Sequence, residues 1–319
     1  RGLITSPIER PMSRPGSDTF VPCAPELVRE VRALAVGGHE RFEREVWSRL
    51  PEAAIPGVSP TPSYHNARHV EAVCDGIEAV FDAFEAGSDP FGLARDARRW
   101  AEEEGGPEPP PGSLRTAFGI AFACHDLGNI ASSDRVDRSD GGLGLEHARA
   151  YDSSALYATP AVEVRSAAIA RALLASEGGD CGRIPALSRL VEHLVLQTVF
   201  HFEKVSDGAP FWFPMQVVDM IGSYFFLAGS RLEAIAGLFA EMRVQKPGAI
   251  PVLPFLASLE ERFERLVPDP GARREVLGIF ERNGRGHTRE TVFAIPARFR
   301  AMTRPVPYEE AIPALLADG

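Results

Sequence analysis

The sequence predicts an all-α protein that folds as a compact bundle of many helices. Apolar residues recur at helical spacing along most of the 319 residues, whereas no stretch alternates apolar and polar residues for long enough to predict a strand. No internal repeat of fixed period is present, so a solenoid or propeller is not indicated. Hydrophobic residues make up 45% of the chain, which is enough for a sizeable core.

The charge balance limits the partners of this protein. The chain has 34 basic and 44 acidic side chains, and the resulting net charge of −10 repels polyanions. We therefore expect neither polymeric nucleic acid nor a membrane as a partner. A small phosphoester substrate is still compatible with this charge, because a bound divalent ion reverses the local potential.

Cysteine usage and hydropathy indicate a cytoplasmic protein. The four cysteines are far apart and form no CxxC pair, so neither a zinc ribbon nor a disulfide-stapled secreted domain is expected. The chain has no run of about 20 uncharged apolar residues, so no membrane-spanning helix is expected. The N-terminus also lacks the order of basic, apolar and small residues that is typical of a signal peptide.

Proline and apolar spacing predict how the N-terminal part is organised. Residues 1–22 contain four prolines and no apolar period, which predicts an irregular N-terminal arm. Residues 23–319 are expected to form a single all-α domain. Its first helical region begins at Pro25 and stops at Pro51, because the apolar spacing continues up to that proline. The four prolines of residues 51–63 then predict an ordered loop or a linker.

The remaining helices follow from apolar periodicity and capping signals. A helix is expected over residues 65–86, and a short charged helix over residues 92–104. Ser113 is a suitable N-cap for the apolar helix LRTAFGIAFACHDLG that follows it. Further helices are expected at residues 143–157, 160–176, 184–203, 212–228, 230–243, 254–267, 271–283 and 307–317.

The first chemical signal is the run YHNARH at residues 64–69. If His65 begins a helix, His69 lies one turn further on the same face, and the two imidazoles converge on one point. This geometry suits a metal site or an acid–base pair. The alternative is structural, with one histidine capping the helix and the other packed beneath it.

The second signal is the pair His125-Asp126, which ends an apolar run from Ala117 to Ala123. An unpaired charge at the end of a buried helix carries a desolvation cost of roughly several kcal/mol, so a compensating group is needed. A divalent ion compensates well, because imidazole nitrogen and carboxylate oxygen both ligate Zn, Fe or Mn. The alternative is a pair that ends the helix and bonds only with the backbone.

The third signal is Asp219, a single acid in the apolar segment FPMQVVDMIGSYFFLAG. Such an acid needs a partner, which could be an arginine, a helix N-terminus or a metal ion. Four other polar residues are uninformative when taken one by one. They are Glu146 and His147 after a Gly-rich loop, and Thr198 and His201 in LVLQTVFHFE.

Taken in order, these signals resemble the class I cyclic nucleotide phosphodiesterases of the HD superfamily. YHNARHVEAV resembles the family motif Y-H-N-x-x-H-A-x-D-V, and TAFGIAFACHDLGN resembles the family helix that ends in H-D. LEHARAYDSSAL resembles the E-x-H-H segment, and QVVDMIGSYFF resembles the helix with the last metal aspartate. The resemblance runs from about Tyr64 to Phe239 and implies an HD-domain, phosphodiesterase-like helical bundle.

This resemblance implies a site for two divalent metal ions. The ligands of the tighter ion, commonly Zn, would be His69, His125, Asp126 and Asp219. Asp126 would also bridge to a second ion, commonly Mg or Mn. A hydroxide that bridges the two ions would attack phosphorus and convert a 3′,5′-cyclic nucleotide to its 5′-monophosphate. His65 would protonate the departing ribose oxygen as the general acid.

The resemblance implies roles for other residues as well. Glu146 would orient His65 or a metal-bound water, and Asn66 would fix the local turn. The expected substrate-binding residues are Tyr64, Thr198, Gln245, Phe255 and Asn129.

Two departures from the family pattern affect these expectations. Asn129 in HDLGN stands where the family has a third histidine, so we expect weaker occupancy of the second metal site. Gln245 in QKPGAIPVLPF is a poor match to the purine-selecting segment Q-x-G-F, and Phe255 is the candidate for the aromatic clamp. The base of the substrate is therefore left open by the sequence.

Three alternatives use the same metal ligands. An HD-superfamily nucleotide or pyrophosphate phosphohydrolase would differ only in substrate. A di-iron HD oxygenase would bind Fe and need more histidines, which His147, His193 and His201 could supply. A non-catalytic domain would keep the metal for stability, although an intact His65 argues against this. A homodimer is compatible with each of these functions.

Overall fold

The computed structural model describes most of the chain between Pro25 and Ala294. The described parts are residue 20 and residues 25–45, 47–49, 63–131, 161–177, 185–198, 208–228, 231–245 and 259–294. The predicted N-terminal arm, apart from Phe20, lies outside the described residues. The helices predicted at residues 143–157 and 307–317 lie outside them as well.

The prediction of an all-α protein is confirmed, because every regular element in these ranges is helical and none is a strand. The elements are α1 (Pro25–Glu45), η1 (Trp47–Arg49), α2 (Ala67–Glu85), α3 (Leu93–Glu104), α4 (Pro111–Cys124), α5 (Leu127–Ala131), α6 (Ala161–Glu177), α8 (Pro185–Leu196), α9 (Trp212–Val217), η5 (Val218–Gly222), α10 (Ser223–Phe226), α11 (Arg231–Gln245), α13 (Leu259–Leu266) and α14 (Pro270–Asn283).

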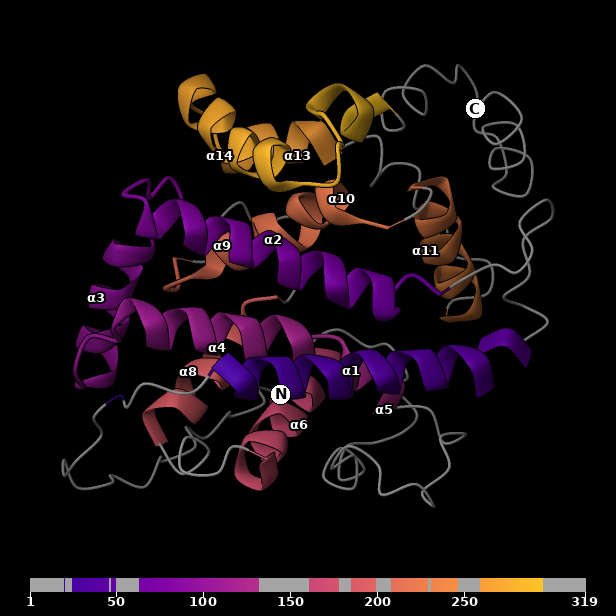
Figure 1. The fold of residues 1–319 in the computed structure, drawn as a ribbon, viewed down its shortest axis with the longest axis horizontal. Coiled ribbons are helices and arrows are strands. Elements are labelled where there is room, and N and C mark those ends of the chain that lie inside the picture. The colour runs from indigo at the N-terminus through magenta and orange to yellow at the C-terminus, as the bar shows by residue number, and fades with distance from the viewer. Residues whose placement is uncertain are drawn as a thin grey trace, which may run out of the picture.

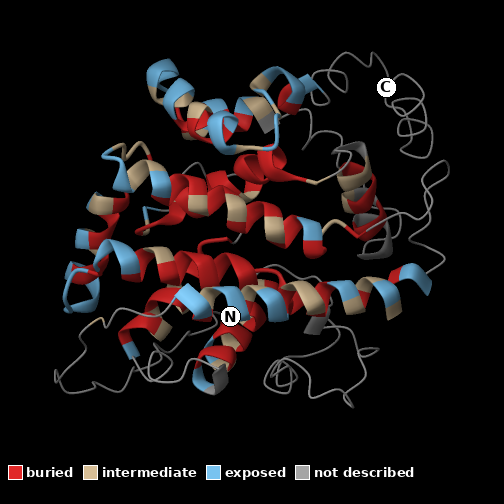
Figure 2. Cartoon of the chain, in the orientation of Figure 1, coloured by how far each residue is buried: buried red, intermediate tan, exposed pale blue. Residues whose placement is uncertain are grey.

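Helices α2 and α4 form the centre of the bundle and pack against each other (Figure 1). Helix α1 packs on both of them, α6 and α8 pack on α4, and η5, α10 and α14 pack on α2. The two central helices are largely buried, whereas α1 and α3 alternate buried and exposed residues (Figure 2). The buried apolar residues between Leu27 and Phe293 form one hydrophobic cluster. Both central helices lead to the residues expected to bind metal.

Helix α2 begins at Ala67, and the expectation that His65 begins this helix is wrong. Asn66 is the N-cap instead, and its side-chain oxygen accepts a hydrogen bond of 3.1 Å from the backbone N–H of His69. A side chain that accepts this bond satisfies one of the donors at the helix start, so the residue before it stays outside the helix. The expected role of Asn66 in fixing the local turn agrees with this geometry.

Two other helix boundaries differ from their predicted positions. Helix α4 begins at Pro111, so Ser113 lies within its first turn and is not its N-cap. Proline is suited to the first position of a helix, because its φ angle is already helical and its missing N–H would have no partner there. Helix α8 ends at Leu196, before the predicted end at residue 203, and residues 197–198 form a turn.

The helix predicted over residues 212–228 is divided into three parts. Helix α9 runs into the π-helical turn η5, which carries Asp219, and α10 follows. The residue before α9, Phe211, has a left-handed φ of 63°, which costs roughly 1–3 kcal/mol for a non-glycine residue. Asp96, which is buried, accepts a 2.8 Å hydrogen bond from the Phe211 N–H. The ring of His193 donates to the carbonyl oxygen of Pro210 at 2.9 Å, so this strained entry to α9 is held from two other helices.

None of the helices in the described ranges is long and apolar enough to cross a membrane.

The close approach of α5 to α6 predicts a large effect of a small substitution. A Cβ atom at Gly128 would overlap the carbonyl oxygen of Val162 and lie 2.9 Å from the hydroxyl oxygen of Ser166. We expect Gly128→Ala to lower the free energy of unfolding by about 2–3 kcal/mol, measured by urea denaturation. Gly37→Ala on α1 is the control, because nothing lies within 4 Å of its added Cβ. The free energy of unfolding of Gly37→Ala should instead rise by roughly 0.5–1 kcal/mol, because alanine has a higher helix propensity than glycine. Equal effects of the two substitutions would contradict this packing.

Candidate metal centre

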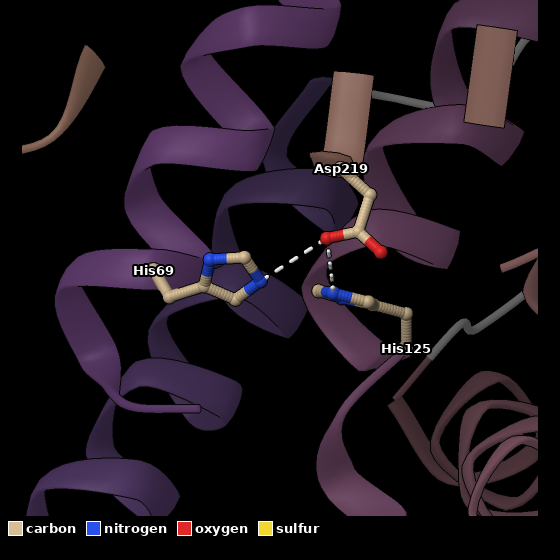
Figure 3. Close-up of side chains that lie close together, drawn as sticks. All are labelled: His69, His125 and Asp219. Atoms are coloured by element: carbon tan, nitrogen blue, oxygen red, sulfur yellow. Dashed lines mark ion pairs between the residues drawn. The ribbon is translucent and has the colours of Figure 1, made fainter. Parts of the chain in front are cut away.

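Three helical segments bring His69, His125 and Asp219 to one point in the interior (Figure 3). His69 is in the first turn of α2, His125 directly follows α4, and Asp219 is on η5. One ligand atom of each residue lies within 4.8 Å of the other two. These three side chains could therefore hold a metal ion.

The distances between ligand atoms match those of a metal site. The Nε2 atom of His69 lies 3.3 Å from Oδ1 of Asp219, and the Nε2 atom of His125 lies 3.6 Å from the same oxygen. In a tetrahedral zinc site with bonds of about 2.0–2.1 Å, neighbouring ligand atoms are about 3.3 Å apart. Asp126 borders the same point, because its Oδ2 atom is 3.4 Å from Nε2 of His69 and 3.0 Å from Nε2 of His125.

Several of these ligand atoms are buried and have no hydrogen-bond partner among the described residues. They are Nε2 of His69, Nε2 of His125 and Oδ2 of Asp126. The other ring nitrogen of His125, Nδ1, donates to the carbonyl oxygen of Phe122 at 2.7 Å. This bond fixes the ring orientation and turns Nε2 toward the cluster, where it can act as a ligand once its proton is displaced. Buried polar atoms normally have partners, so the cluster fits a divalent ion with imidazole and carboxylate ligands, such as Zn, Fe or Mn.

The charges of the cluster are strongly coupled. Burial alone would lower the pKa of His69 and His125, but the nearby carboxylates of Asp126 and Asp219 raise both pKa values. Burial would likewise raise the pKa of Asp126 and of Asp219, and the imidazoles hold both well below the ordinary range. Without a metal the cluster therefore retains protons on its imidazoles. A divalent ion must displace these protons, so metal binding should release protons and weaken at low pH.

His65 lies beside the cluster and is held by a glutamate from α11. Its Nδ1 atom donates to Oε2 of Glu241 at 2.6 Å, and its Nε2 atom lies 3.9 Å from Oδ1 of Asp126. Burial opposes protonation of His65, but the charges of Asp126 and Glu241 raise its pKa to about 9. Both ring nitrogens of His65 thus carry protons near neutral pH. Nδ1 is bound to Glu241, and Nε2 lies near Asp126.

Two expected substrate-binding residues lie near the cluster. The ring centroid of Tyr64 is 4.9 Å from that of His65 and from that of His69. Burial raises the pKa of Tyr64 well above its ordinary value, as does the proximity of Tyr224, with which its side chain forms a hydrogen bond. The Nδ2 atom of Asn129 donates to Oδ1 of Asp126 at 3.4 Å. Asn129 therefore contacts a carboxylate of the candidate metal cluster directly.

The other expected site residues are not brought to the cluster by the described parts of the chain. The hydroxyl of Thr198 donates to the carbonyl oxygen of Val195 at 2.7 Å, which is a local bond at the end of α8. Gln245 is the last residue of α11, and nothing is described of its side chain. The remaining residues lie outside the described ranges. They are Glu146, His147, His201 and Phe255.

Three residues near the cluster were missed by sequence reasoning. Glu241 is one of several charged residues on α11, and its contact with His65 spans 176 residues of sequence. His39, on α1, donates from Nδ1 to the carbonyl oxygen of His65 at 2.9 Å. Glu163, on α6, has a buried Oε2 atom that finds no hydrogen-bond partner in the described ranges, and burial together with the charge of Asp126 raises its pKa. None of the three belongs to a local motif, so no signal in the sequence distinguishes them.

The fold and the site together define an all-α protein with a buried His/Asp cluster that could hold a metal ion. Comparisons of the chain with family models, with curated proteins and with solved structures give no match.

Removal of the Asp219 charge should weaken metal binding. We expect Asp219→Asn to lower the affinity for Zn²⁺ by at least about 10-fold, because a neutral amide is a poorer ligand than a carboxylate. Elemental analysis after dialysis and titration with a zinc indicator measure this affinity. Asp82→Asn, an exposed position on α2 that pairs with Arg115, is the matched control and should bind like the parent chain. Equal binding by both variants would contradict the proposed ligand set.

The buried imidazole of His39 predicts a pH-dependent stability. Burial lowers its pKa to about 4, against an ordinary value of 6.5, although the charge of Asp126 opposes the shift. Between pH 6.5 and about 4, the His39 imidazole is protonated in the unfolded chain but stays neutral in the folded chain. Acidification through this window should therefore remove about 3 kcal/mol from the free energy of unfolding.

The variant His39→Asn tests this prediction, because asparagine can keep the donor to His65 but does not titrate. The free energy of unfolding is measured by urea denaturation of the metal-free protein across the same pH window. On acidification through this window, the free energy of unfolding of the variant should fall by about 3 kcal/mol less than that of the parent chain. Parallel pH profiles for the two proteins would show that His39 is not a buried neutral imidazole.

Proposed function

We propose that this chain is a metal-dependent phosphohydrolase of the HD-superfamily type that hydrolyses a phosphodiester. The proposed substrate is a 3′,5′-cyclic nucleotide, and the product is the 5′-monophosphate. One observation carries the proposal. A buried His/Asp cluster that could hold a metal lies beside His65, whose Nδ1 is bound to Glu241 and whose Nε2 lies near Asp126. The motifs that resemble the class I cyclic nucleotide phosphodiesterases support the same reaction.

The metal-binding roles are divided between two groups of residues. His69, His125, Asp126 and Asp219 would hold the tighter ion, which we propose is Zn²⁺. Asp126 would also help to hold a second ion, Mg²⁺ or Mn²⁺. Asn129 donates a hydrogen bond to this carboxylate, and the charge of Asp126 raises the pKa of Glu163. When bound, such ions make hydroxide available from water near neutral pH and neutralise charge on the phosphoryl oxygens.

His65 would act as the general acid. A water first loses its proton to solvent, and the resulting hydroxide oxygen forms a bond to phosphorus as the bond from phosphorus to the ribose 3′ oxygen breaks. The departing oxygen takes the proton from Nε2 of His65, while Nδ1 donates to Glu241 and keeps the ring in one orientation. Glu241 would thus orient His65, which is one of the roles that the family resemblance implied for Glu146, a residue outside the described ranges.

The alternatives share the metal ligands and differ in chemistry. A nucleotide or pyrophosphate phosphohydrolase would use the same cluster on a different ester. A di-iron oxygenase would need further histidine ligands, and one of the three candidates, His193, donates its Nε2–H to the carbonyl oxygen of Pro210. That bond commits His193 to holding the strained entry to α9, so His193 is not available through Nε2 as a ligand of a second iron, and the other two candidates lie outside the described residues.

An assay panel combined with metal analysis tests the proposal. The purified protein is loaded with Zn²⁺ and Mg²⁺ or Mn²⁺ and assayed on cyclic AMP, cyclic GMP, cyclic dinucleotides, a generic phosphate bis-ester, nucleoside triphosphates and pyrophosphate. We expect hydrolysis of a diester and loss of this activity after chelation. Activity on triphosphates or pyrophosphate alone would favour the first alternative. A coloured, iron-loaded protein with no hydrolytic activity would favour the oxygenase.

Substitution of His65 separates its role from metal binding. We expect His65→Ala to lower turnover by about 10² to 10⁴-fold, the usual scale for loss of a general acid. Metal content and melting temperature should stay nearly unchanged, because His65 is not among the proposed ligands. His287→Ala is the matched control, since His287 contacts the carbonyl oxygen of Leu227 and lies outside the cluster. Loss of metal in His65→Ala would assign this residue as a ligand instead.

A further inference from the structure

The four residues before α2 are held by side chains from distant helices. Residues 63–66 are not helical, yet their backbone N–H and carbonyl groups form hydrogen bonds. Glu241 accepts hydrogen bonds from the N–H of Tyr64 at 2.7 Å and from the N–H of His65 at 2.9 Å. The side chain of Asn66 donates to the carbonyl oxygen of Ser63. This segment carries the proposed general acid, so its backbone determines where that imidazole lies.

Helix α1 provides the other half of these contacts. Nδ1 of His39 donates to the carbonyl oxygen of His65 at 2.9 Å, and Oε1 of Glu43 accepts from the N–H of Ser63 at 3.1 Å. His39 and Glu43 are four residues apart, so they lie on the same face of α1, one turn from each other. The helix itself packs on α2, α4 and α5, so its position is fixed relative to the metal cluster.

The partner of His39 determines its protonation. A carbonyl oxygen only accepts hydrogen bonds, so Nδ1 must carry the proton. His39 is fully buried, and burial lowers its pKa to about 4, so the ring is neutral. Its other nitrogen, Nε2, is buried and has no hydrogen-bond partner in the described chain. An apolar side chain of similar size would avoid this cost, so His39 is better explained by what it fixes than by stability.

We propose that His39 and Glu43 are positioning residues that form, together with Glu241, a backbone clamp around residues 63–66. The clamp holds the His65 imidazole at a fixed place beside the metal cluster. This inference rests on the proposed function, because positioning affects a rate only where His65 transfers a proton. Displacement of a catalytic group by about 1 Å can cost roughly 10²-fold in rate. Helix α1 would therefore influence turnover without contacting the substrate.

The test compares two substitutions of His39 in the metal-loaded chain of residues 1–319. His39→Leu removes the donor and approximately keeps the volume, whereas His39→Asn places an amide N–H near the original position of Nδ1–H. Backbone amide exchange of Tyr64 and His65 is measured together with kcat, KM and metal content, using a substrate hydrolysed in the assay panel or the generic bis-ester. Glu40→Ala, at an exposed position on the same helix, is the control.

We expect His39→Leu to accelerate amide exchange of Tyr64 and His65 by at least about 10-fold. The substitution removes the hydrogen bond to the His65 carbonyl oxygen that helps to hold this segment. Turnover should fall by about 10 to 10²-fold while KM and metal content stay nearly constant. His39→Asn should restore most of the exchange protection and turnover. Glu43→Leu should likewise accelerate amide exchange at Ser63, the other end of the segment. Glu40→Ala should change neither amide exchange nor turnover.

Other outcomes separate the clamp from the proposed reaction. Unchanged amide exchange in a folded His39→Leu protein would overturn the clamp, whatever the activity. An equal loss of turnover in His39→Leu and His39→Asn would indicate a packing role and would also overturn it. If the parent chain hydrolyses nothing in the panel but exchange responds as expected, the clamp is supported and the proposed reaction is wrong.

Discussion

The structure depends on the burial of two imidazoles and two carboxylates in an apolar interior. His69, His125 and Asp126 are almost completely enclosed, and Asp219 closes the group from a third segment. Charged groups in such surroundings carry a desolvation cost that they must offset among themselves or through a bound cation. The opposite shifts of their pKa values express this mutual dependence. A chain that could not hold these segments within hydrogen-bonding distance would expose or neutralise the cluster.

The helices around the cluster supply that precision. The packing of α2 on α4 sets the separation of the two histidines, and the close contact at Gly128 brings α6 against α5, the helix that directly follows Asp126. The third segment is placed by a strained residue, Phe211, which Asp96 holds from α3. The π-helical turn then changes the helical phase at Asp219. Strain and irregular backbone are thus found next to the site, where they have a geometric purpose.

Local patterns predicted most of the helices and the residues of the metal cluster, because apolar period and the HD pair are features of neighbouring residues. Contacts over long sequence distances could not be predicted in this way. Glu241 looks like an ordinary surface acid until the fold brings α11 to His65, and the same holds for His39 on α1. Gly222, the last residue of the π-helical turn, lies so close to the ring of Phe280 that an added Cβ would meet it at 2.9 Å, and no short pattern encodes this contact. The proposed reaction itself remains a prediction from motifs and geometry.

The four acid and imidazole groups differ in their access to water, and this has a consequence for exchange of the ion. The side chain of Asp219 is 27% exposed, whereas those of His69 and His125 are 3% and 2% exposed. In the described chain the group is therefore most accessible to water at Asp219, and a chelator would approach a bound ion from this side. Release of the ion would begin with detachment of this outermost oxygen, so the mobility of one short turn would set how long the cation resides.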